Sequence, residues 1–190
     1  AGIILKPREN ISIYASYSES FLPRSGEQFA NINGANNALD PNTFTNLEAG
    51  IKWNFNPRIS FTASIFELQQ DVTVSDGMGG SEENESEVQG LEAQFQGQIT
   101  DSWSILAAYS HLDGEAENGN SPRELPEHSF SVWNQYKLTE RLGLGLGVTY
   151  QDETYITDDN DTKLPGYVRV DAAAYYDISE NLRIQLNIEN

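Results

Sequence analysis

The sequence predicts an all-β fold: an antiparallel, up-and-down transmembrane β-barrel, present here as an open, curved fragment of about nine strands. Three observations lead to this prediction. Apolar and polar residues alternate along many segments, short and long connections alternate between those segments, and acidic residues gather in the long connections.

Alternation is clearest in residues 91–100, LEAQFQGQIT, where one parity is apolar and the other is mostly Glu and Gln. Successive side chains of a strand point to opposite faces, so this strand has one apolar and one polar face. The same pattern predicts strands at 46–55, 142–151 and 182–190, and a less regular form of it at 11–21, 59–74, 103–112, 128–138 and 167–176. No segment has a helical period.

Two kinds of protein use such strands. In a soluble β-sandwich the apolar face packs on a core and the polar face meets water. In an outer-membrane barrel the apolar face meets lipid and the polar face lines a wet lumen. The mean hydropathy of −0.52 does not separate them. No apolar run approaches the roughly 20 residues of a spanning helix, but a barrel strand spans with about 9 to 11 residues, half of them polar.

The connections favour the barrel. Short polar turns are predicted at 56–58, 100–102, 139–141 and 178–181, and long connections at 22–42, 76–84, 113–125 and 152–163. Strict alternation puts all turns at one rim and all long loops at the other, as in outer-membrane barrels with periplasmic turns and external loops. Aromatic residues beside the short turns suit a membrane-interface girdle, whereas Trp133 falls on the polar parity of its strand.

Charge restricts the function. The chain has 11 Lys and Arg against 29 Asp and Glu, a net charge of −18, which argues against nucleic-acid binding because phosphates attract basic surfaces. Most of the acids lie in or beside the long loops, where only Arg24, Arg123 and Lys163 oppose them. We expect an anionic rim that attracts divalent cations and repels anions, although a solvated acidic surface without a specific cation site fits equally well.

Nothing in the sequence indicates catalysis. The chain has no Cys, and its two histidines, His111 and His128, form no recognisable motif. GMGG at 77–80 lacks the Lys of a phosphate-binding loop, and DDNDTK at 158–163 lacks the Gly and the final Glu of an EF-hand. We therefore predict a protein that is not an enzyme, with no cofactor and no metal site.

Several segments resemble the C-terminal part of the barrel of TonB-dependent siderophore receptors. IYASYSESFLPRSG is similar to the strand that leads into the Ser-Phe-x-Pro loop of that family, and LDPNTFTNLEAGIKWNF to its Glu-x-Gly-x-Lys strand. VQGLEAQFQGQITDSWSILAAYSHLDGE resembles the Gly-x-Glu strand, turn and following strand. ELPEHSFSVWNQYKL and LPGYVRVDAAAYYDISENLRIQLNIEN resemble the Pro-x-His and Pro-Gly-Tyr segments near the family's C-terminus.

This resemblance implies a receptor in the cell outer membrane of a Gram-negative bacterium, which takes up a ferric siderophore by energised, TonB-dependent transport. Its partners would be the ferric siderophore, the TonB energy-transducing complex acting through a plug domain, and outer-membrane lipid and lipopolysaccharide, with no nucleic acid. The alternatives are a passive porin, a TonB-dependent receptor for cobalamin or a carbohydrate, and a soluble β-sandwich module for binding or adhesion.

The resemblance also implies that residues 1–190 are a partial barrel domain, from which the plug domain, the early strands and the last strand are absent. In a 22-stranded plugged barrel they would cover roughly strands 13 to 21. The opening AGIILKPREN is interrupted by Lys6 and Pro7 and does not resemble an export signal. Such an open sheet would leave two unpaired edges, so we expect no transport from these residues alone.

Four residues on the side of the long loops are candidate ligand contacts: Phe21, Arg24, Phe29 and Tyr155. Aromatic rings can stack on a chelate and a guanidinium can pair with its oxygens. Packing in the aromatic girdle and a loop salt bridge are the structural alternatives. The acidic loops favour a neutral or cationic ferric hydroxamate over a trianionic ferric catecholate.

Overall fold

The computed structural model describes residues 1–22, 41–75 and 81–190. Ten strands form one sheet: β1 (Gly2–Arg8), β2 (Ile11–Leu22), β3 (Asn42–Asn56), β4 (Ile59–Ser75), β5 (Ser81–Gln98), β6 (Trp103–Ala116), β7 (His128–Lys137), β8 (Leu142–Gln151), β11 (Tyr167–Ser179) and β12 (Leu182–Ile188). A separate two-stranded sheet contains β9 (Thr154–Tyr155) and β10 (Lys163–Leu164).

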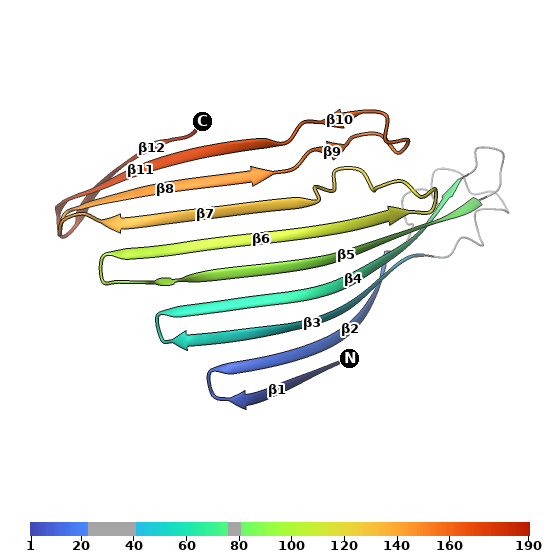
Figure 1. The fold of residues 1–190 in the computed structure, drawn as a ribbon, viewed down its shortest axis with the longest axis horizontal. Coiled ribbons are helices and arrows are strands. Elements are labelled where there is room, and N and C mark those ends of the chain that lie inside the picture. Colours follow the sequence, from blue (N-terminus) through green and yellow to red (C-terminus); the bar gives the residue numbers. More distant parts are fainter. Residues whose placement is uncertain (23–40, 76–80) are drawn as a thin grey trace.

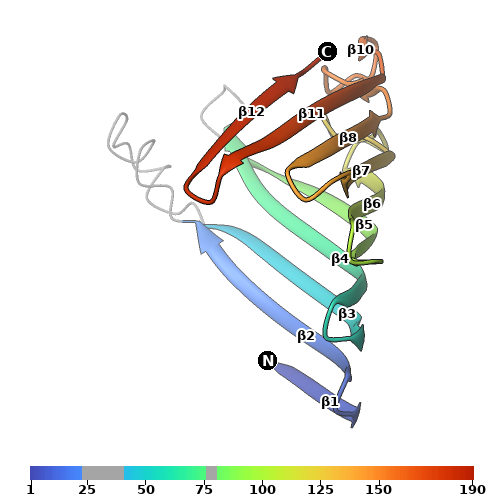
Figure 2. The ribbon, with the colours of Figure 1, turned by 90° about the vertical axis from the view of Figure 1, so that its left-hand side faces the viewer.

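The strands of the large sheet lie side by side in chain order, and every neighbouring pair is antiparallel. The sheet twists and curves without closing, so that β1 and β12 are its two edges (Figures 1 and 2). The predicted up-and-down antiparallel fold and its open, curved form are confirmed. The described residues include no helix long and apolar enough to span a membrane.

Three strands were not predicted: β1 in the large sheet, which has ten strands where about nine were expected, and the short strands β9 and β10. Gly2–Arg8 pairs with the start of β2, and the register shifts between Leu5 and Arg8. Pro7 falls in this shift, and an irregularity of the ladder is a place where a strand tolerates Pro, which has no N–H to donate. The stretch is therefore a strand although Lys6 and Pro7 interrupt its apolar run.

The apolar face of the sheet is exposed. Ala173, 7% exposed, is the one apolar side chain classed as buried among the described residues. In contrast, Ile65, Leu146 and Leu186 are between 51% and 60% exposed. A β-sandwich buries such residues beneath a second sheet, and no described element covers them. The apolar parity therefore forms an open outer face, as the barrel hypothesis requires.

The polar face is hollow. A cavity of about 870 Å³ extends over it from β3 to β7 and is lined by Lys52, Gln96, Trp133 and Gln135 among others. Trp133 lies on this face because Gly145 and Gly147 of β8 leave room for its ring: a Cβ at these glycines would lie 2.5 Å and 2.6 Å from the ring. The glycines of LGLGLG thus explain the residue that departed from the predicted pattern.

Turns and long connections are sorted to opposite ends of the sheet, as predicted (Figure 1). Two of the predicted long connections contain strand residues, however. Residues 76–84 were predicted to be a loop, but the backbone ladder between β4 and β5 continues as far as Ser75 and Ser81, so residues 81–84 belong to a strand. The predicted loop at 152–163 contains the β9–β10 hairpin.

Near the long-loop end of β4, apolar and polar residues exchange faces of the sheet. Ile65 points to the outer face, but beyond it Glu67 shares that face and Phe66 and Leu68 lie on the concave parity. Phe66 packs over Gly90, where a Cβ would lie 2.3 Å from its ring. This exchange marks the outer limit of the apolar band, because beyond the hydrocarbon the outer face of a strand meets water or polar head groups.

Candidate functional site

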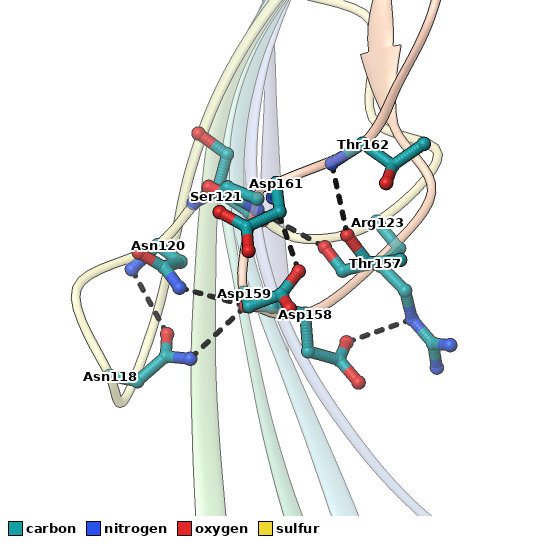
Figure 3. Close-up of polar contacts among 10 residues, drawn as sticks. Asn118, Asn120, Ser121, Arg123, Thr157, Asp158, Asp159, Asp161 and Thr162 are labelled. Carbon is teal, nitrogen blue, oxygen red and sulfur yellow. Dashed lines mark hydrogen bonds and ion pairs between the residues drawn. The ribbon is translucent and has the colours of Figure 1, made fainter.

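The candidate site is the long-loop rim, where two connections lie against each other. The β6–β7 connection covers residues 117–127 and the β8–β11 connection covers residues 152–166. We call the contacts between residues 118–124 and residues 155–160 the loop clasp. Figure 3 shows that its side chains come from both connections and point toward one another.

Asparagine side chains make most of the loop clasp. Asn118 Nδ2 and Asn120 Nδ2 both donate to the Asp158 carbonyl oxygen, at 3.3 Å and 2.8 Å. The Ser121 amide donates to Asn160 Oδ1 at 2.9 Å, and Asn160 Nδ2 donates back to the Ser121 carbonyl oxygen at 3.0 Å. Because these bonds satisfy backbone groups on both sides, they hold two loops from different hairpins in one arrangement.

Two residues of the loop clasp have left-handed backbones. Asn160 has φ of 56° and Glu124 has φ of 58°. Asn adopts this conformation more readily than most residues, so Asn160 suits its turn. Glu124 is held there by its amide, which donates to the Tyr155 carbonyl oxygen at 2.8 Å. Backbone conformation and contacts between the loops therefore depend on each other.

Ion pairs neutralise only part of this rim. In the described part of the two connections, Arg123 Nε lies 2.8 Å from Asp158 Oδ1, and the Lys163 ammonium pairs with Glu153. Acids without such a pair include Glu117, Glu124, Asp159 and Asp161, so the surface keeps its anionic character. The hydrogen bond from the Thr157 side chain, followed by one from the Asp161 amide, lowers the pKa of Asp159 below its ordinary value.

Tyr155 is fixed by the β9–β10 hairpin. It pairs with Lys163 across the hairpin, and Lys163 Nζ lies 4.6 Å from the centre of its ring. The hydrogen bond to Glu153, with a further contribution from Tyr155, raises the pKa of Lys163 above its ordinary value. Tyr155, a candidate ligand contact, thus has a cation over its ring. This feature depends on the β9–β10 hairpin and was not predicted from the sequence.

Of the other candidates, Phe21 alone lies among the described residues. Phe21 is 58% exposed near the end of β2, and its pairing with Thr43 places it on the outer parity. Arg24 and Phe29 lie outside the described residues. Asn118, Asn120, Ser121 and Asn160 were not predicted; the turn-forming composition of ENGNSP and DDND was their one available signal.

Polar and charged residues on the concave face bond to one another. Arg169 Nε lies 2.9 Å from Asp171 Oδ2, and the Tyr14 hydroxyl donates to Glu48. Asp171 Oδ1 is buried without a hydrogen-bond partner among the described residues. These bonds join residues of the inner wall and are separate from the hydrogen bonds of the loop clasp.

An exposed apolar outer face, a hollow polar inner face and rims of opposite character define the wall of an outer-membrane β-barrel. The family model described as TonB dependent receptor-like, beta-barrel matches residues 1–190. The chain belongs to this family. The predicted resemblance is therefore confirmed over the whole chain, and the family is one of receptors and transporters.

Individual relatives belong to the same family of receptors. The chain is 35% identical to the probable TonB-dependent siderophore receptor PiuA of Acinetobacter baumannii, over all of this chain and 29% of that protein. It is 28% identical to the catecholate siderophore receptor Fiu of Escherichia coli K12, over all of this chain and 28% of that protein. The crystal structure of PiuA superposes with a TM-score of 0.88 at 33% identity, covering 99% of this chain and 30% of that one. The chain thus spans less than a third of the length of these two relatives.

Proposed function

We propose that the intact protein is an outer-membrane receptor that imports a ferric siderophore by TonB-dependent transport. The observation that carries this proposal is the match of all 190 residues to the barrel of TonB-dependent receptors. The names of PiuA and Fiu, both siderophore receptors, support iron chelates over cobalamin or a carbohydrate. The proposed activity is gated transport, in which the protein makes and breaks no bond of the substrate.

The proposal includes the extent of the chain. Residues 1–190 would be the C-terminal part of the barrel, with the plug domain, the early strands and the last strand outside them. Support comes from the two open edges of the sheet, β1 and β12. Backbone N–H and C=O groups at an open edge find no hydrogen-bond partners in the hydrocarbon of a membrane. In the complete wall each edge would pair with a further strand, and TonB would act through the plug.

The loop rim would receive the ferric chelate. Tyr155, with Lys163 on its ring, offers an aromatic and cationic surface for the oxygens of a chelate within an otherwise acidic rim. Phe21, Arg24 and Phe29 complete the proposed set of contacts. The loop clasp would keep the β6–β7 and β8–β11 connections together as one surface.

Iron uptake by the full-length protein tests the function. The receptor is expressed in a Gram-negative host that lacks its own siderophore receptors, and uptake of radiolabelled iron is measured with one hydroxamate and one catecholate carrier. We expect uptake with at least one carrier, abolished when the host's TonB is deleted. Uptake that persists without TonB would identify a passive porin, and uptake with neither carrier would contradict a siderophore receptor of these classes.

A further inference from the structure

The two histidines of the chain meet on the outer face of the sheet, opposite the concave face. His111 on β6 and His128 on β7 are paired in register, and their rings stack with centroids 4.6 Å apart. Glu127 adds a carboxylate, with Oε1 3.7 Å from His128 Nε2. One ligating atom from each of these three residues lies within 4.8 Å of the other two.

This cluster lies at the end of the β6–β7 ladder. His111 and His128 are the last pair of the β6–β7 ladder; beyond them β6 continues against β5 alone, and β7 is replaced by the loop. One row below lie Tyr109 and Phe130 on the same face. One row above, Asp113 follows on β6. The cluster therefore lies at the outer edge of the apolar band, in the row of Leu91 and Ile65, between an aromatic row and an acidic residue.

Hydrogen bonds orient both imidazoles. His111 Nδ1 lies 3.2 Å from the Glu127 carbonyl oxygen, which can only accept, so Nδ1 carries the proton and Nε2 of the neutral ring keeps its lone pair. His128 Nδ1 lies 2.9 Å from the Tyr109 hydroxyl, which can accept in the same way. Metal-binding histidines are oriented by such contacts of their second nitrogen.

We propose that His111, Glu127 and His128 bind a divalent transition-metal ion, and that the ion clips β6 to β7 at the base of the loop. Two imidazole nitrogens and one carboxylate oxygen suit Zn²⁺, Cu²⁺ or Ni²⁺ rather than Ca²⁺ or Mg²⁺, which prefer oxygen ligands. Three protein ligands leave a position for water or for an oxygen of a lipid head group.

Small side-chain rotations would complete the site. Metal–ligand distances of roughly 2.0–2.2 Å require the donor atoms to move closer together than they lie here, by on the order of 1 Å. The side chains of His128 and Glu127 are 42% and 67% exposed, so no packed core resists this movement. The acidic residues on the same outer face also raise the local concentration of cations.

The test uses the full-length receptor in detergent, titrated with Zn²⁺ by calorimetry. Other parts of the full-length receptor can bind Zn²⁺ as well, so the amount of Zn²⁺ bound is compared between the unaltered protein and its variants. We expect the double variant His111→Gln with His128→Gln to lose one equivalent of Zn²⁺. Glu127→Gln should keep the site but weaken it about tenfold or more, since even outer-shell changes cost 10- to 100-fold. Asp113→Asn, an acidic neighbour outside the site, should bind as the unaltered protein does.

Electron paramagnetic resonance of bound Cu²⁺ provides a second readout that needs no variant to fold. A spectrum with coupling to two imidazole nitrogens supports the site. Unchanged Zn²⁺ stoichiometry in the double histidine variant, an equal loss in Asp113→Asn, or Cu²⁺ without nitrogen coupling would each overturn the proposal. None of these results depends on which substrate the receptor transports.

Discussion

Asn160 and Ser121 exchange two hydrogen bonds between loops that are 39 residues apart in the chain, and this pair is the centre of the loop clasp. Asn160 also donates to the Thr157 carbonyl oxygen of its own turn at 3.3 Å. One side chain thus satisfies backbone groups of both loops. A single substitution can therefore separate the contribution of the loop clasp from that of the barrel wall beneath it.

Asn160→Ala should loosen both connections. It removes the hydrogen bonds of the side chain, each worth roughly 0.5–1.5 kcal/mol, so amide exchange in residues 118–124 and 155–160 should accelerate about fivefold or more. Asn160→Gly is the matched control for the backbone, because Gly adopts a φ of 56° without strain. We expect the Gly variant to exchange faster than the unaltered protein but more slowly than the Ala variant. Equal exchange in all three proteins would show that the loop clasp does not order the loops.

Gly147→Val should destabilise the barrel through Trp133. Even a Cβ at position 147 would lie 2.6 Å from the ring, so the indole has to move, at a cost of about 1–3 kcal/mol for an overpacked site. Gly143→Ala on the same strand is the control, since its Cβ would make an ordinary contact of 3.7 Å with Tyr175. The thermal unfolding midpoint of the full-length protein should fall for the first variant and not for the second. Adding Trp133→Ala should cancel most of the penalty of Gly147→Val; additive losses would contradict this packing.

Much of the wall could be predicted because its physical signal is local. A period of two residues assigns each side chain to a face, and short polar turns set the order of neighbouring strands. The segments 91–100 and 142–151 show this in the sequence: residues 91–98 of the first and all of the second lie in strands with the predicted faces. The β1 strand was missed because its apolar run is short and irregular.

The rim could not be predicted in the same way, since its contacts join distant segments. Counting acids indicated an anionic surface but not that Asp158 pairs with Arg123, or that its carbonyl oxygen accepts two asparagine amides. The pairing of His111 with His128 likewise depends on the register between β6 and β7. Spacing along the chain gives no measure of that register when a loop separates the strands.

Acid should loosen the turn that contains Asp159. Its pKa is lowered in the folded loop, chiefly by the hydrogen bond from Thr157, so its charged form contributes stability at pH above its ordinary value of 3.8. That contribution is lost as the pH falls through the lower, folded value. Amide exchange of residues 157–162, corrected for its intrinsic pH dependence, should therefore accelerate below about pH 4. Thr157→Val should move the pKa of Asp159 up toward its ordinary value. If amide exchange accelerates in acid to the same extent in the Asp159→Asn variant, this carboxylate is not the cause.

Leu146→Arg should be among the most damaging changes to the outer face. Leu146 lies on β8 midway along the apolar parity from Leu142 to Tyr150 and is 51% exposed, so in the membrane this position faces acyl chains. An Arg near the midplane of a barrel costs about 2–4 kcal/mol. Gln135→Arg introduces the same residue on the concave, polar face of β7 and should cost much less. Denaturant-dependent folding of the full-length protein into lipid vesicles measures both. If Gln135→Arg proved the more destabilising variant, the assignment of the apolar face to lipid would be wrong.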